Sequence, residues 1–152
     1  MKILVDTSVW SLALRRKSVR PIPASVRALT DLVADGRVAM LGVVRQELLS
    51  GIRAQEDFEL LRDRLRAFAD EEVSTEDFEQ AAGFFNLCRS HGVQGSNTDF
   101  LICAVAARRR YPILSTDHDF ERYARWVPIV LHATPSREGA GGPRAVRVQV
   151  SG

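Results

Sequence analysis

The chain has 152 residues, enough to bury a hydrophobic core in a single domain. Hydrophobic residues make up 45% and charged residues 26%, as in ordinary globular proteins, and no apolar run approaches the roughly 20 residues of a membrane-spanning helix. The net charge of +2 is too small to indicate a nucleic-acid partner by itself, although Arg, a bidentate phosphate ligand, supplies nearly all of the positive charge. The N-terminus lacks the pattern of a signal peptide, so we expect a cytoplasmic protein with no membrane partner.

Short apolar runs alternate with segments of helical periodicity from the N-terminus to about residue 132. In chain order, the pattern predicts a strand at 2–6, helices at 8–16 and 22–36, a strand at 37–41, helices at 42–52 and 56–68, a short strand around Val73, helices at 74–92 and 98–110, a strand at 112–116, a short helix within 120–126 and a strand at 127–132. Strands that alternate with helices are typical of a mainly parallel sheet with helices on both faces. We therefore expect a three-layer α/β/α fold around such a sheet.

We expect one domain at 1–132 and a C-terminal tail at 133–152. The tail, ATPSREGAGGPRAVRVQVSG, is rich in Gly, Pro and Ser, a composition typical of flexible segments. The alternation of Val146, Val148 and Val150 would allow a terminal strand only if a sheet edge or a partner captured it.

Two acids stand at the ends of predicted strands. Asp6 directly follows the apolar run at 3–5, and Asp117 follows the strand at 112–116. In an open parallel sheet, ligands bind beyond the C-terminal ends of the strands, where the following loops meet. We therefore expect Asp6 and Asp117 to lie at the same edge of the sheet.

Two further acids are candidates for this edge. Asp99 opens the helix that leads into the strand before Asp117, and Glu47 lies in the helix that follows the second long strand. Each has an ordinary alternative explanation. The helix dipole favours an acid in a first turn, as at Asp99, and Glu47 could be a solvated acid on a polar helix face. The sequence pattern leaves both alternatives open.

Gathering four carboxylates would be costly, because two ionised acids about 5 Å apart repel by roughly 3 kcal/mol at an effective dielectric near 20. Such a cluster requires protonation, basic neighbours or a bound cation. Oxygen ligands without a Cys or His cluster favour Mg²⁺ or Mn²⁺, and a cation held in this way is suited to phosphate chemistry. Ser8 and Thr116 are placed to donate hydrogen bonds that orient Asp6 and Asp117.

The segments ILVDTSVW, VVRQELLSG, TDFLICAVA and ILSTDHDF, in this order, resemble a PIN domain, and specifically the VapC-type toxins of bacterial type II toxin–antitoxin pairs. The resemblance covers residues 2–131. It implies an Mg²⁺- or Mn²⁺-dependent endoribonuclease that forms a homodimer and is inhibited by a VapB-type antitoxin whose tail crosses the active-site groove. The implied catalytic acids are Asp6, Glu47, Asp99 and Asp117, with Asp119 as a supporting acid.

The favoured hypothesis is cleavage of RNA by metal-activated water, with Asp6, Asp99 and Asp117 holding the metal and Glu47 completing the pocket. A PIN-like protein that binds RNA or a partner without catalysis is the alternative, and the complete set of mutually repelling acids argues against it. Asp-dependent phosphatase and phosphotransfer folds are disfavoured, because position 8 is Ser where the first would need Asp, and no Lys follows Lys17 where the second would need one.

Overall fold

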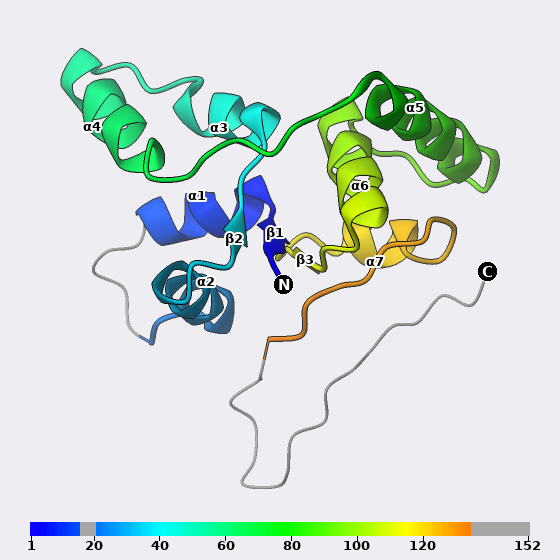
Figure 1. Ribbon diagram of the computed structural model, residues 1–152, viewed down its shortest axis with the longest axis horizontal. Helices are drawn as coiled ribbons and strands as arrows, with labels where there is room; N and C mark the ends of the chain where they lie inside the picture. Colours follow the sequence, from blue (N-terminus) through cyan, green and yellow to red (C-terminus); the bar gives the residue numbers. More distant parts are fainter. Residues whose placement is uncertain (16–20, 135–152) are drawn as a thin grey trace, which may run out of the picture.

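The computed structural model describes residues 1–15 and 21–134 and shows a small parallel sheet surrounded by helices (Figure 1). The sheet has three strands in the order β2-β1-β3: β1 at Ile3–Val5, β2 at Val38–Ala39 and β3 at Ile113–Leu114. The central strand β1 pairs in parallel with both neighbours, with Leu4 opposite Ala39 on one side and Ile113 on the other. The expected α/β fold with a parallel central sheet is confirmed.

Helices follow the strands in the predicted alternation and flank the sheet. They are α1 (Thr7–Arg15), α2 (Ala24–Ala34), α3 (Gly42–Leu49), α4 (Gln55–Leu65), α5 (Thr75–Ser90), α6 (Asn97–Arg109) and α7 (Asp119–Tyr123). Figure 1 shows α4 and α5 at opposite ends of the view, with the sheet, α1 and α6 between them. Gly36 follows the end of α2 in the left-handed conformation, with φ at 65°, which a residue without Cβ adopts without strain.

Two predicted strands are wrong. Around Val73 the chain forms no strand, because pairing stops at an isolated bridge between Met40 and Asp70 and the chain then enters the N-cap of α5 at Ser74. The expected strand at 127–132 is only an isolated bridge between Ile113 and Leu131. Pro128 interrupts the segment, and proline cannot donate a ladder hydrogen bond.

The core consists of β1, β3 and the helices packed on them. All three residues of β1 are buried, and so is every residue of α6 from 100 to 106. A helix that is apolar on all sides belongs in the interior, so only its ends reach the surface. Asp99, in the first turn of α6, is thereby placed at an edge of the core.

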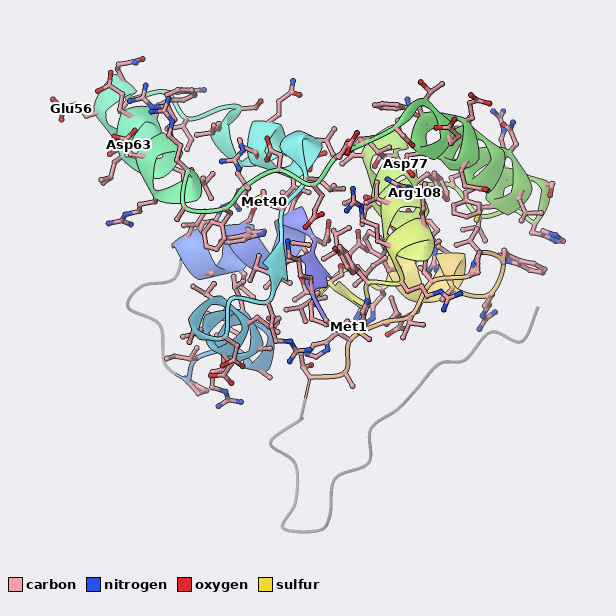
Figure 2. All side chains as sticks on the ribbon, viewed as in Figure 1. Met1, Met40, Glu56, Asp63, Asp77 and Arg108 are labelled. Atoms are coloured by element: carbon pink, nitrogen blue, oxygen red, sulfur yellow. The ribbon has the colours of Figure 1, made fainter. Side chains whose placement is uncertain are left out.

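An ion pair joins α5 to α6. Arg108 donates to both carboxylate oxygens of Asp77, at 2.5 and 2.6 Å, and the Asp77 side chain is only 1% exposed (Figure 2). Asp77 also completes a capping box with Ser74 at the start of α5. The Asp77 carboxylate therefore caps the start of α5 and links that helix to the end of α6.

Within the described residues, no helix combines the length and the apolar character needed to cross a membrane. The expected tail lies outside the described residues from position 135 onward, and so does the alternation of Val146, Val148 and Val150.

Candidate active site

Asp6 lies where β1 ends, and the register of the sheet determines its neighbours. Val5 pairs with Leu114, so the residues that follow each strand, Asp6 and Ser115, come together. Asp6 donates its backbone N–H to the carbonyl of Leu114 at 2.9 Å. Its Oδ2 accepts hydrogen bonds from the hydroxyls of Ser8 and Ser115, each at 2.8 Å, and the residue is 5% exposed. Two neutral donors therefore fix a nearly buried carboxylate.

Asp117 is held by the loop that follows β3. It donates its backbone N–H to Ser115 Oγ at 2.9 Å, and its Oδ1 accepts the backbone N–H of Asp119 at 2.9 Å. Ser115 thus contacts the side chain of Asp6 and the backbone of Asp117 at once. The strand ends bring the two acids to one edge, as their positions in the sequence predict.

The expected role of the Thr116 side chain requires a correction. Thr116 contributes its backbone N–H, which donates to Ser8 Oγ at 3.1 Å. Among the described residues its hydroxyl donates no hydrogen bond to Asp117, and the hydroxyl that links the acids is that of Ser115. Successive side chains at the end of a strand point in opposite directions, so only one of the two neighbours can face Asp6.

Asp99 lies in the first turn of α6. Its backbone N–H donates to the N-cap side chain of Ser96 at 3.1 Å, and its Oδ2 accepts a hydrogen bond from the Tyr123 hydroxyl at 2.7 Å. Burial raises the pKa of the Asp99 carboxyl, the negative charges of Asp6 and Asp117 raise it further, and the Tyr123 hydrogen bond opposes both. The three Asp carboxylates are therefore close enough to interact electrostatically.

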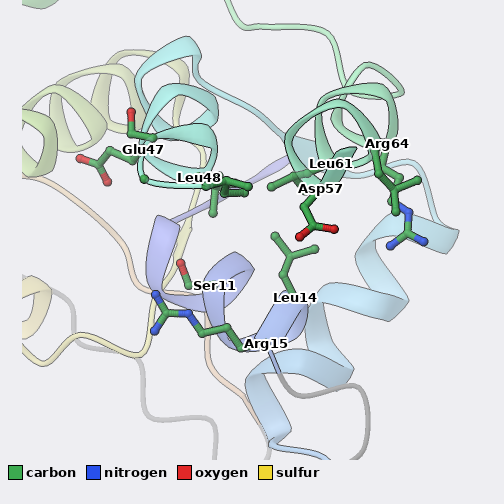
Figure 3. Close-up of a pocket in the computed structure, with 12 residues that line it drawn as sticks. Ser11, Leu14, Arg15, Glu47, Leu48, Asp57, Leu61 and Arg64 are labelled. Carbon is green, nitrogen blue, oxygen red and sulfur yellow. The ribbon is translucent and has the colours of Figure 1, made fainter. Parts of the chain in front are cut away.

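Glu47 is connected to this edge through one hydrogen bond. Its Oε2 accepts the hydroxyl of Thr7, the residue after Asp6, at 2.8 Å. Glu47 is exposed at the side of a cleft of about 430 Å³ between α1, α3 and α4, with apolar Leu48 and Leu61 further in (Figure 3). Its exposure agrees with the solvated-acid alternative, and its bond to Thr7 places it beside the Asp6 end of the sheet.

Asp119 begins α7, and its carboxylate lies 3.7 Å from the Arg122 guanidinium. Its link to the acids is its backbone hydrogen bond to Asp117. Next to it, His118 is 89% exposed and lies 3.6 Å from Glu121. Asp119 therefore contacts Asp117 through its backbone N–H, and its supporting role stays a prediction.

Residues 3–125 match the family model of the PIN domain, which spans both strand-end acids, Glu47 and Asp99. The chain belongs to the PIN domain family. The structure is similar to that of FitAcB from Neisseria gonorrhoeae, at 21% identity with a TM-score of 0.64, covering 80% of this chain and 92% of that one. It is also similar to VapBC2 from Rickettsia felis bound to a DNA fragment from their promoter, at 19% identity with a TM-score of 0.69, covering 87% and 98%. The search of curated proteins gave no match.

The donor atoms of this PIN domain site suit a hard divalent cation. They are carboxylate oxygens, and within residues 1–15 and 21–134 none of Asp6, Asp99 and Asp117 forms an ion pair with a basic side chain. In that part of the chain, no three His, Cys, Asp or Glu side chains form a preassembled metal-binding cluster. The chemistry therefore fits Mg²⁺ or Mn²⁺, while the side chains are not gathered into a closed ligand shell.

Three contacts of this PIN domain site were not predicted from the sequence: those of Thr7 with Glu47, of Ser115 with Asp6, and of Tyr123 with Asp99. Thr7 and Ser115 each adjoin a predicted residue, so a hydroxyl beside a strand-end acid is a usable signal. Tyr123 is 24 positions from Asp99, and only the packing of α7 beside α6 brings them together.

Proposed function

We propose that this PIN domain is a metal-dependent endoribonuclease. The observation that carries the proposal is the convergence of Asp6, Asp99 and Asp117 at the carboxyl edge of a parallel sheet, where the first and third raise the pKa of the second. A fold without catalysis would have no need to retain acids that repel one another. That cost argues against the alternative, a PIN-like protein that acts by RNA or partner binding alone.

Each residue has a distinct part in the proposed reaction. Asp6, Asp99 and Asp117 would hold Mg²⁺ or Mn²⁺, and Glu47 would complete the pocket, either as a further ligand or as the group that positions the attacking water. When bound, the cation makes a water more acidic and offsets charge on the phosphate oxygens.

The RNA backbone needs cationic guidance toward these acids. Arg15 and Arg64 line the same cleft as Glu47, and the described residues give neither of them an ion pair. Both are free to contact phosphate groups through interactions that weaken with salt.

We further propose that the chain is a VapC-type toxin that acts in the cytoplasm as a homodimer and is inhibited by a VapB-type antitoxin. The sequence motifs support this proposal, as does the likeness of the fold to VapBC2 and FitAcB over most of both chains. Expression alone is expected to arrest growth, and co-expression of the antitoxin to restore it. Growth unaffected by a folded, expressed chain would contradict the toxin assignment.

Metal removal tests the nuclease directly. Purified protein incubated with total RNA in Mn²⁺ is expected to give discrete fragments that disappear in EDTA and return when Mn²⁺ is restored, since the carboxylates alone do not activate water. Sequencing of the fragment ends would define the substrate. Cleavage that persists at full rate in EDTA would rule out the metal-dependent mechanism.

Ser115, which links the two acids, should contribute more to the cleavage rate than its neighbour Thr116. Ser115→Ala removes the hydroxyl that holds both Asp6 and the Asp117 backbone, so we expect cleavage to fall about 10- to 100-fold, as for other groups that orient metal ligands. Thr116→Val keeps the backbone donor to Ser8 and should lose much less. Cleavage rates at fixed Mn²⁺ measure both, and equal losses would contradict the assigned roles.

A further inference from the structure

We propose that Tyr123 is a positioning residue that fixes the Asp99 carboxylate for cation binding, an inference that rests on the proposed metal-dependent function. The Tyr123 hydroxyl donates to Oδ2 of Asp99 at 2.7 Å. The hydrogen bond restricts the rotation of the carboxylate and engages only one of its two oxygens. Donors of this kind, one step behind the ligand, orient it and raise metal affinity.

The aromatic packing around Tyr123 makes its hydroxyl a fixed point. The residue is 0% exposed, and its ring centroid lies 4.8 Å from that of Phe100 and 5.3 Å from that of Phe120. Phe100 follows Asp99 in α6, and Phe120 lies in α7 together with Tyr123. Rotation of the phenol away from Asp99 would displace one of these buried rings, so the hydroxyl has little freedom to move.

The loop before α6 is shaped to admit this hydroxyl. A Cβ built on Gly95 would overlap the hydroxyl oxygen of Tyr123 and would lie 2.9 Å from a ring carbon of Phe100. Ser96, the next residue, caps α6 by accepting the backbone N–H of Asp99. The Gly-Ser pair therefore allows Tyr123 to approach Asp99 while the cap holds the Asp99 backbone.

The hydrogen-bond donor to Asp99 is neutral, whereas the donor to the structural carboxylate of Asp77 is charged. Asp77, which ties α5 to α6, is bound by the guanidinium of Arg108, and the pair leaves little net charge. Asp99 is bound by a hydroxyl, which orients the carboxylate and leaves its negative charge for a cation. Because Tyr123 belongs to the helix that follows Asp117, the same contact also couples the two acidic segments at α6 and α7 (Figure 1).

Mn²⁺ binding to the full-length chain tests the inference without reference to catalysis. Free Mn²⁺ is measured by its electron paramagnetic resonance signal as the ion is titrated into wild type, Tyr123→Phe, Tyr111→Phe and Asp99→Asn. Tyr111→Phe is the matched control, because it removes the same atom just past the far end of α6, about 18 Å from Asp99. Gly95→Ala is a second, independent variant, which keeps the Tyr123 hydroxyl but obstructs its position.

We expect Tyr123→Phe and Gly95→Ala to raise the Kd for Mn²⁺ about tenfold or more, Tyr111→Phe to match wild type, and Asp99→Asn to lose more affinity than either. Saturating Mn²⁺ should restore the cleavage rate of Tyr123→Phe, because the substitution weakens cation binding and leaves the cation ligands in place. Wild-type affinity in Tyr123→Phe would overturn the inference and leave the metal-dependent function standing. Wild type that binds no Mn²⁺, or binds it independently of Asp99, would overturn both.

Discussion

Asp6→Asn should abolish RNA cleavage while the chain stays folded. Asn matches Asp in shape and still offers an oxygen to the hydroxyls of Ser8 and Ser115, so the packing of the strand end is preserved. The substitution removes the charge that would hold the cation. Loss of several kcal/mol of transition-state stabilisation lowers the rate by about a thousandfold or more. Fragment yield from total RNA in Mn²⁺ measures the effect.

The same substitution is expected to leave the thermal stability of the chain unchanged or to increase it, in contrast to its effect on cleavage. The charge of Asp6 raises the pKa of the nearby Asp99 carboxyl, which is a sign of unfavourable interaction between the two ionised groups. In EDTA, Asp6→Asn should therefore unfold at the same temperature as wild type or higher. Asp63→Asn, at an exposed acid paired with Arg62, is the control and should change neither property. A stable Asp6→Asn chain that still cleaves RNA would remove Asp6 from the site.

The position of the strand-end acids could be predicted because it depends only on the direction of the strands. Parallel strands deliver the residues after their C-terminal ends to one edge, whatever their register. The hydroxyl partner of Asp6 depends on the register itself, since Val5 opposite Leu114 selects Ser115 and excludes the side chain of Thr116. A shift by one residue reverses which side chain faces the site, and the sequence does not determine that shift.

Contacts between residues that lie far apart in the sequence could not be predicted either. Tyr123 is a core aromatic residue in a short helix. Its hydroxyl reaches Asp99 only because α7 packs beside α6. The partners of the basic side chains at the end of α6 were equally beyond prediction: Arg108 pairs with Asp77, and Arg109 pairs with Glu71. Periodicity identifies a helix face and does not identify the neighbour that it meets.

Asp77→Asn should destabilise the fold without affecting the active site. The nearly buried carboxylate accepts two hydrogen bonds from Arg108, and it caps α5 through the backbone N–H of Ser74. Removing the charge from such a pair costs about 2–3 kcal/mol, which lowers the melting temperature by about 8 °C in a domain of this size. Thermal unfolding at neutral pH in EDTA measures the loss, and Asp63→Asn again serves as the exposed control.

The pH dependence of this loss identifies its cause. The hydrogen bond from Arg108 is the main reason that the pKa of Asp77 lies below its ordinary value of 3.8. A carboxyl whose pKa is lower in the folded state stabilises the protein above its unfolded pKa, and this contribution fades as the pH falls toward the folded pKa. The difference in unfolding free energy between wild type and Asp77→Asn should therefore be constant above about pH 5 and should shrink below pH 3.8. A difference that persists unchanged in acid would assign the effect to the shape of the helix cap rather than to the ion pair.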